Sequence, residues 1–294
     1  MLSVWILYFS NVKKTDQMFE KITQPGELSE MAREIRKDIV KSLAVAGSGH
    51  TGGALGLADV FTVLYFNRMN HRPEDPEWPE RDRLILSIGH VAPVLYTTLA
   101  HAGYFQVNEL TTLRKLGSRL QGHPGRDHHL PGLELSAGSL GQGLSVAVGM
   151  ALAAKLDQHS WKVFSVHGDG ELQEGAIWEA AMSAAHYKLD NLIAIIDRNH
   201  VQIDGPTSHV MEINPLAEKW KAFGWEVFEC DGNNISELIA TFKNAENVVG
   251  KPSVIIARTL MGKGVRSIEG DYRWHGKAPG TAEAEEFIRQ LEEN

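Results

Sequence analysis

Short apolar runs alternate with longer amphipathic stretches along this chain, and the alternation restricts the fold more than any other feature. The runs occupy residues 83–87, 162–166, 191–197, 225–230 and 252–257. Runs of this length are typical of strands buried on both faces of a sheet. Helical patterns separate or flank them at residues 28–46, 55–69, 91–102, 140–157, 173–188, 215–223, 234–248 and 282–293. This order predicts a three-layer α/β fold, with a mostly parallel sheet and helices on both faces.

The 294 residues contain no internal repeat and no low-complexity tract, which predicts one domain over residues 21–294 after an N-terminal arm of residues 1–20. The arm opens with a largely apolar stretch of eight residues, LSVWILYF. This stretch is too short to cross a bilayer, and it lacks the basic region and cleavage site of a signal peptide. We therefore expect no membrane interaction.

Composition excludes some classes of function. A formal net charge of -8 argues against a protein whose main partner is nucleic acid, because such proteins carry a clustered basic excess. The single cysteine, Cys230, excludes an intrachain disulfide and favours a cytoplasmic location. Because Cys230 lies in the apolar run 225–230, we expect it to be a buried strand residue.

A glycine-rich turn with an acidic residue follows the run 162–166. Gly168 and Gly170 flank Asp169 and let the backbone bend sharply and approach a bound group closely. Taken alone, an aspartate at such a turn favours a helix N-cap. The next strand suggests a second role.

Asn199 follows the run 191–197, and 28 residues separate it from Gly170. That spacing fits a strand, a crossover helix and a return strand, which brings both strand ends to the same edge of the sheet. Asp169, Asn199 and a nearby carbonyl such as that of Val201 form a set of oxygen ligands suited to Mg²⁺ or Ca²⁺. Because Mg²⁺ often completes its shell with phosphate oxygens, we predict a metal-bridged diphosphate here.

The GDG turn followed at this spacing by asparagine resembles the thiamine diphosphate motif. Further segments resemble the diphosphate-binding domain of transketolases, in the order that family has them. These segments are SGHTGG (48–53), LSIGHVAP (86–93), QGHPGR (121–126), SAGSLGQGLSVAVGMALA (136–153), GDGELQEGAIWEAA (168–181), IDRNHVQIDG (196–205) and RTLMGKGV with WHGKAPG (258–280). The resemblance covers residues 28–280 and implies the thiamine diphosphate-binding fold.

The resemblance implies thiamine diphosphate and Mg²⁺ as cofactors, with Ca²⁺ or Mn²⁺ able to replace Mg²⁺. Asp169, Asn199 and the carbonyl of Val201 would be the metal ligands. The residues implied to contact the cofactor are His50, His90, Gly138, Leu140, Gly170, Asn199 and His275. From the residues alone, the glycine-rich segment around Gly138 is equally compatible with close helix packing.

Four of the 13 histidines lie beside glycine in loop-like contexts: His50, His90, His123 and His275. A lone histidine is more often a satisfied polar residue, but gathered imidazoles can bind hydroxyls and move protons near neutral pH. The resemblance implies that His50 and His275 handle the hydroxyl next to the breaking bond, whereas His90 and His123 orient the two-carbon unit. The histidines expected in surface positions or loops are His128, His129, His200 and His209.

Glu174 follows the GDG turn by one helical turn. Its charge would complement the dipole at the start of the next helix in any fold of this kind. The resemblance adds a catalytic role, because the matching glutamate of the family belongs to a proton relay across the subunit interface.

Full-length members of the family continue through a pyrimidine-binding domain and a C-terminal domain, whereas this sequence ends at Asn294. The resemblance therefore implies the N-terminal subunit of a split transketolase, active only with a C-terminal partner subunit in an α2β2 assembly. The expected reaction moves a two-carbon ketol unit from a ketose phosphate to an aldose phosphate, as in the pentose phosphate pathway.

Several related functions stay open from the sequence. The enzyme alternatives are a dihydroxyacetone synthase, a 1-deoxyxylulose-5-phosphate synthase and the α subunit of a 2-oxoacid dehydrogenase. The alternative that is not an enzyme is a regulatory protein that binds the cofactor but has lost catalysis. Ile88 and Met261 stand where some relatives carry a basic residue, so the resemblance does not imply a particular donor sugar.

Overall fold

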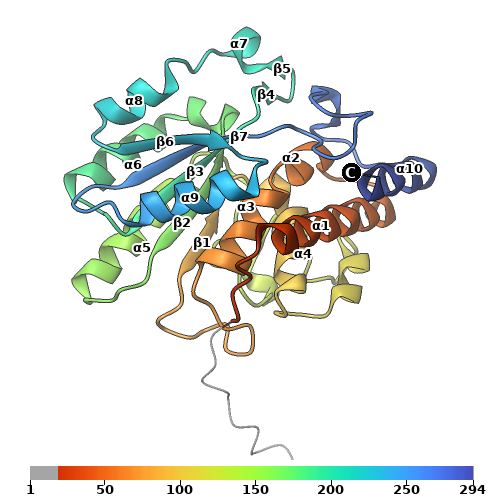
Figure 1. Cartoon of the computed structure of the whole chain (residues 1–294), viewed down its shortest axis with the longest axis horizontal. Coiled ribbons are helices and arrows are strands. Elements are labelled where there is room, and N and C mark those ends of the chain that lie inside the picture. Colours follow the sequence, from red (N-terminus) through yellow and green to blue (C-terminus); the bar gives the residue numbers. More distant parts are fainter. Residues whose placement is uncertain (1–18, 294) are drawn as a thin grey trace, which may run out of the picture.

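A five-stranded sheet lies at the centre of the structure, a computed structural model that describes residues 19–293 (Figure 1). All neighbouring strands are parallel, as predicted. In spatial order the strands are β1 (Arg83–Leu86), β2 (Val163–Gly168), β3 (Leu192–Arg198), β7 (Ser253–Arg258) and β6 (Glu226–Asp231). Each of them coincides with one of the apolar runs. A separate antiparallel ribbon, which was not predicted, consists of β4 (Val201–Gln202) and β5 (Gly205–Pro206).

Alternate residues of the central strands face two different cores. In β3, Ile193 and Ile195 pack into one core, whereas Leu192, Ala194 and Ile196 pack into the other. Successive side chains of a strand point to opposite faces, so a sheet covered on both sides requires apolar residues at every position. This explains why the strands read as continuous apolar runs in the sequence.

Helices cover both faces of the sheet and complete the predicted three layers (Figure 1). The α-helices are α1 (Pro25–Ala46), α2 (Thr51–Gly56), α3 (Ala58–Val63), α4 (Ala92–His101), α5 (Gly143–Leu156), α6 (Gly175–His186), α7 (Thr207–Val210), α8 (Leu216–Ala222), α9 (Ile235–Glu246) and α10 (Thr281–Glu292). One core includes residues of α1, α3, α4, α9 and α10, and the other includes residues of α5, α6 and α8.

Six short helical turns complete the described chain: η1 (Leu64–Arg68), η2 (Gly89–Val91), η3 (Val107–Thr112), η4 (Arg126–His128), η5 (Gly170–Gln173) and η6 (Tyr272–Trp274). Of these, η1 is a π-helical turn and the others are 3₁₀-helical. No helix within residues 19–293 combines the length and the apolar character needed to cross a membrane.

One predicted helix was wrong in its extent. The single helix expected over residues 55–69 is replaced by α2, α3 and η1, and α2 begins earlier, at Thr51. A Cβ atom on Gly56 would lie 3.0 Å from the carbonyl oxygen of Leu260, and one on Gly52 would lie 2.6 Å from Cγ of Met261. Tertiary packing against the loop after β7 therefore sets the start of this region, which periodicity alone does not reveal.

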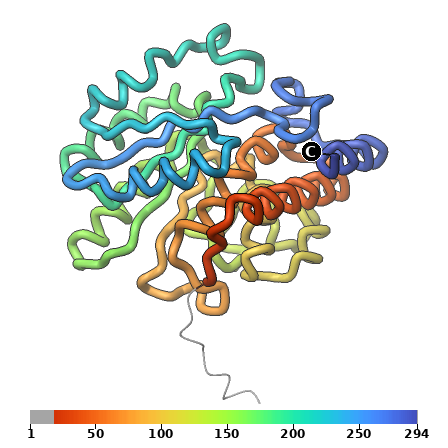
Figure 2. Tube along the Cα trace, viewed as in Figure 1, coloured from red at the N-terminus to blue at the C-terminus, as the bar shows by residue number. Residues whose placement is uncertain are grey.

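The first and last helices lie side by side although they are far apart in the sequence (Figure 2). Helix α1 begins with Pro25, buries Leu28, Ile35 and Ile39 on one face, and ends at Gly47 in the left-handed conformation. Proline at the first turn and glycine just after the last are typical helix boundaries. Most of the predicted N-terminal arm, residues 1–18, lies outside the described residues.

Candidate active site

The carboxyl ends of β1, β2 and β3 border a cavity of about 440 Å³. Every site residue predicted from the sequence lines this cavity: His50, His90, His123, Gly138, Leu140, Asp169, Gly170, Glu174, Asn199, Val201 and His275. Ligands of parallel α/β proteins commonly bind outside the carboxyl ends of the strands. The cavity volume is also within the range usual for small-molecule sites.

The four histidines predicted to be catalytic form one cluster. The ring centroid of His50 lies 4.9 Å from that of His90, 5.6 Å from that of His275 and 6.4 Å from that of His123. His90 and His275 are 5.0 Å apart by the same measure. Four segments far apart in the sequence thus bring their imidazoles together. The expected surface histidines, His128, His129, His200 and His209, are exposed.

The pKa of every histidine in the cluster lies below its ordinary value. Burial and the neighbouring rings lower the pKa of His90 to about 3. Burial, His275 and Arg114 lower the pKa of His50 to about 4. Burial lowers the pKa of His275, and burial with Arg114 lowers that of His123. Unprotonated imidazole nitrogens can accept hydrogen bonds from hydroxyl groups.

One buried atom of the cluster lacks a partner. Nδ1 of His50 is buried without a hydrogen bond to any described residue. Buried polar atoms are nearly always hydrogen-bonded, so an unsatisfied one in a cavity indicates a site for a ligand or water.

Asp169 and Asn199 follow adjacent strands, as the spacing predicted. The carboxylate of Asp169 accepts hydrogen bonds from the backbone N–H of Gly170 and of His200, both at 2.8 Å. Asn199 donates from Nδ2 to Asp197 at 2.8 Å, and its Oδ1 accepts from the N–H of Val201 at 3.0 Å. The amide of Asn199 is therefore fixed in orientation beside the GDG turn.

A buried arginine beside Asp169 was missed from the sequence. Nη1 of Arg198 lies 2.8 Å from Oδ2 of Asp169 and 3.0 Å from the hydroxyl of Thr207. Burial raises the pKa of Asp169, and the Arg198 charge opposes this rise. The position of Arg198 at the end of β3, next to Asn199, is the signal that could have indicated it.

Asp197, which also lines the cavity, was likewise missed from the sequence. It is fully buried, accepts from Thr259 and Asn199, and has its pKa raised to about 7, mainly by burial and also by the nearby Asp169. Within residues 19–293, no group of three or more His, Cys, Asp or Glu side chains is arranged for a metal ion. The predicted ligand set is of another kind, because only Asp169 contributes a carboxylate, while Asn199 contributes an amide oxygen and Val201 a backbone carbonyl. Hard oxygen atoms of this kind fit Mg²⁺.

Gly170 of the GDG turn lines the cavity beside Gln202. A Cβ atom on Gly170 would lie 3.1 Å from Oε1 of Gln202, so a side chain there would crowd its neighbour. Glu174 is exposed at the rim of the cavity, where it directly precedes α6. The cavity therefore borders the turn where Gly170 carries no side chain, and Glu174 lies at its rim.

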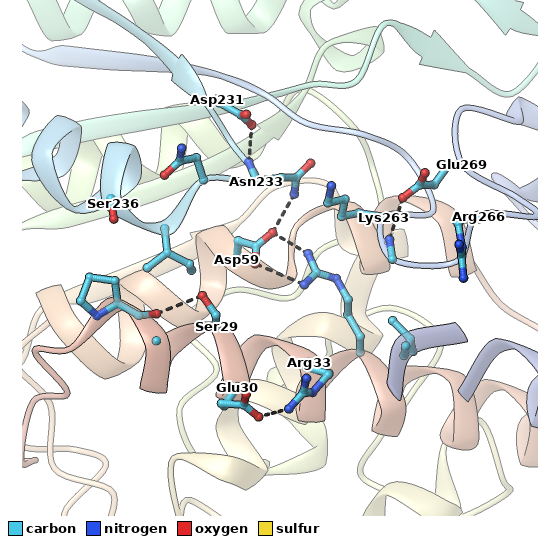
Figure 3. A pocket seen from close by; sticks show the side chains of 17 residues that line it. Ser29, Glu30, Arg33, Asp59, Asp231, Asn233, Ser236, Lys263, Arg266 and Glu269 are labelled. Carbon is cyan, nitrogen blue, oxygen red and sulfur yellow. Dashed lines mark hydrogen bonds and ion pairs between the residues drawn. The ribbon is translucent and has the colours of Figure 1, made fainter. Parts of the chain in front are cut away.

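A larger hollow of about 810 Å³ lies elsewhere, between α1, the start of α9 and the loop after β7 (Figure 3). Two ion pairs form between charged side chains that line it. Arg36 forms a buried ion pair with Asp59, which also accepts from Nδ2 of Asn233 at 2.8 Å. Arg33 pairs with Glu30. None of the predicted site residues lines this hollow, so the candidate active site is the smaller cavity.

Residues 28–293 match a family model described as the thiamine diphosphate binding domain of transketolase. A subunit of the apulose-4-phosphate transketolase of Phocaeicola vulgatus is 43% identical over 258 residues, which cover 88% of this chain and 91% of that protein. A 6-deoxy-6-sulfo-D-fructose transketolase subunit of Clostridium sp. is 44% identical over 252 residues, covering 86% and 91%.

Longer transketolases are also similar. Human transketolase is 40% identical over 267 residues, which cover 90% of this chain and 42% of that protein. The solved transketolase from Campylobacter jejuni matches with a TM-score of 0.82 and 36% identity, over 92% of this chain and 42% of that one. The chain thus spans less than half the length of these two relatives. Because the family model matches nearly the whole of it, the chain belongs to the transketolase family and corresponds to its thiamine diphosphate binding domain.

Proposed function

We propose that this chain is the N-terminal subunit of a transketolase that binds Mg²⁺ and thiamine diphosphate and works with a C-terminal partner subunit. Together the two chains transfer a two-carbon ketol unit from a ketose phosphate to an aldose phosphate. The observation that carries the proposal is the cavity in which four imidazoles and the oxygen atoms of Asp169 and Asn199 meet.

The residues of the cavity suit this cofactor. Asp169, Asn199 and the carbonyl of Val201 would hold the metal ion, and the N–H of Gly170 would donate to the diphosphate. His50, His90, Gly138, Leu140, Asn199 and His275 would form the remaining contacts. When bound, thiamine diphosphate supplies the nucleophile for the ketose carbonyl and accepts the electron pair of the carbon–carbon bond that breaks.

The histidines would manage the protons of the sugar. Because the pKa values of His50 and His275 are lowered, both rings would be unprotonated when the sugar arrives and could accept a hydrogen bond from the hydroxyl beside the breaking bond. His90 and His123 would orient the two-carbon unit by hydrogen bonds. Glu174, exposed at the rim, is placed to join a proton relay with a second subunit.

The substrate class follows from the same resemblance. The relatives named above act, by their names, on apulose 4-phosphate and on 6-deoxy-6-sulfo-D-fructose. Both sugars carry an anionic group. We extend this feature to the present chain and propose a ketose donor with a phosphate end group. The pentose phosphate pathway and a cytoplasmic location stay predictions.

A partner subunit is supported by the names of the relatives, since two of them are subunits of transketolases. The resemblance implies that a further glutamate, which activates the cofactor, would lie in the pyrimidine-binding domain. We propose that the partner supplies this domain in an α2β2 assembly. Apolar side chains on the exposed faces of α5 and α6 suit such contacts, with Leu156 73% exposed and Met182 58% exposed.

The proposed function is tested by assaying ketol transfer from a ketose phosphate with the chain alone, and then with its co-purified partner. We expect transfer only from the mixture, and loss of transfer when EDTA removes the metal. A 2-oxoacid serves as the control substrate. Full activity of the chain alone would refute the need for a partner, and activity with the 2-oxoacid would favour the dehydrogenase alternative.

A further inference from the structure

A buried glutamate next to the GDG turn has four hydrogen-bonding partners. Glu171 lies in η5, and its side chain is completely buried. Its Oε1 atom accepts from the hydroxyl of Ser87 and, at 2.7 Å, from the N–H of Gly141. Its Oε2 atom contacts Nδ1 of His167 at 3.1 Å and accepts from the N–H of Gly168 at 3.3 Å.

Ser87 extends these contacts to a second amide of the glycine-rich loop. While its hydroxyl donates to Glu171, its Oγ atom accepts from the N–H of Gly143 at 3.1 Å. A Cβ atom on Gly143 would lie 2.4 Å from Cβ of Ser87, so this approach requires glycine. The loop of residues 138–143, which we call the glycine loop, is thus held at two of its amides.

The segments joined by Glu171 are those that border the cofactor cavity. Ser87 directly follows β1, Gly168 ends β2 at the GDG turn, and Gly138 and Leu140 line the cavity from the glycine loop. Gly141 has a φ of +85°, and a Cβ atom there would lie 2.7 Å from Cβ of Glu174. The glycine loop therefore packs directly against the rim residue as well.

We propose that Glu171 is a positioning residue that, together with Ser87, holds the glycine loop against the GDG turn before any ligand enters. The backbone of Gly138 and Leu140 is thereby presented to the cofactor without reorganisation when it binds. The proposal rests on the proposed function for its ligand, thiamine diphosphate, but the contact itself is a property of the chain alone.

The first test measures amide hydrogen exchange at single-residue resolution in the ligand-free full chain. In Glu171→Ala, the amides of Gly141 and Gly143 should exchange about 10-fold faster, because the variant removes the buried acceptor of Gly141 and the partner that orients Ser87; tenfold corresponds to ~1.4 kcal/mol. Glu171→Gln retains one carbonyl oxygen for Gly141, and we expect it to restore part of the protection there.

Asp82→Asn is the matched control. Asp82 is another buried acid that accepts two backbone N–H groups, those of Asn70 and Lys162, but it lies next to the opposite end of β1. The variant Asp82→Asn should leave the amide exchange rates of Gly141 and Gly143 unchanged relative to those of the rest of the chain. Equal exchange at these two amides in Glu171→Ala and in Asp82→Asn would overturn the proposal.

Ser87→Ala keeps the test decisive even if Glu171→Ala fails to fold. It removes the acceptor of Gly143 and leaves the Glu171 bond to Gly141 in place. We expect faster exchange at Gly143 than at Gly141. Unchanged exchange at Gly143 would count against the proposed role of Ser87.

The second test measures binding of thiamine diphosphate with Mg²⁺ by calorimetry, using the chain together with its partner subunit. Glu171→Ala should weaken binding about 10-fold, whereas Glu171→Gln and Asp82→Asn should weaken it less. Absence of binding by the wild-type complex would contradict the proposed function. Normal binding by Glu171→Ala, with wild-type binding intact, would contradict only the positioning role.

Discussion

At the scale of single residues, the candidate site combines imidazoles of lowered pKa with one buried ion pair. The pKa values of His50 and His90 are lowered because both rings are largely buried and lie beside other basic groups, which makes protonation of either ring costly. The Asp169 carboxylate, in contrast, stays next to the Arg198 guanidinium, with both side chains almost fully buried. Each of these features predicts a measurable effect on stability.

His90→Asn should flatten the pH dependence of stability on the acid side. The pKa of His90 is about 3 in the folded chain, against an ordinary value of 6.5. The unfolded chain therefore binds the proton first, so the stabilisation is complete above pH 6.5 and is lost as the pH falls toward 3. Thermal unfolding, followed by circular dichroism from neutral pH downward, measures the slope.

His209→Asn is the control for that measurement, because His209 is exposed and lies outside the cluster. It should keep the wild-type slope. An identical slope for His90→Asn and the wild type would show that the proton on His90 does not contribute.

Asp169→Asn should lower the free energy of unfolding by about 3 kcal/mol, because it leaves the Arg198 charge buried without a counter-ion. A second substitution, Arg198→Met, should recover much of this loss by removing the unpaired charge. Urea unfolding of the two single variants and the double variant measures the coupling. Additive losses would contradict a stabilising pair.

At the scale of elements, two glycines of the α5 helix occupy contrasting environments. Gly143, at the first position, lies against Ser87, whereas Gly149 has no atom within 4 Å of the place where a Cβ would stand. The start of α5 thus requires glycine for close packing, and its middle does not. This difference separates a packing effect from helix propensity within one helix.

Gly143→Ala should destabilise the chain by about 1–3 kcal/mol, because the added methyl group overlaps Ser87. Gly149→Ala should stabilise it by about 0.5–1 kcal/mol through helix propensity. Chemical denaturation of both variants gives the comparison. A stabilising Gly143→Ala would mean that the loop before α5 shifts freely, against the close packing described above.

At the scale of the whole molecule, the last helix supports the site from a distance. His275 directly follows η6, in which the ring of Trp274 packs edge-on against Phe287 of α10, with centroids 5.1 Å apart. Helix α10 in turn lies beside α1. The position of His275 therefore depends on the packing of α10 against Trp274 and against α1.

Phe287→Ala should lower the free energy of unfolding by about 3–5 kcal/mol, as truncation of buried aromatic residues does. It should also speed hydrogen exchange at the amide of His275, which donates to the carbonyl of Tyr272 at 2.8 Å. Ile288→Ala, at a half-buried neighbouring position, is the control and should do less to both. Unchanged exchange at the amide of His275 would show that the packing of α10 does not stabilise this part of the site.

Much of the site could be predicted because its residues directly follow apolar runs that are recognisable as strands in the sequence. Gly168, Asp169 and Gly170 directly follow a buried run, and Asn199 follows the next one. Parallel strands bring such positions to a single edge whatever the details of packing. The histidines joined them by resemblance to a family, and the structure places all four in one cluster.

The sequence by itself determined the strands, their parallel direction and the edge at which chemistry is possible, because burial on both faces imposes continuous apolar runs. Only the tertiary structure decided which side chains pair. Ser87 meets Glu171 across 84 positions and Arg198 meets Asp169 across 29. Such contacts depend on how crossover segments pack together, and no periodicity in the sequence records that geometry.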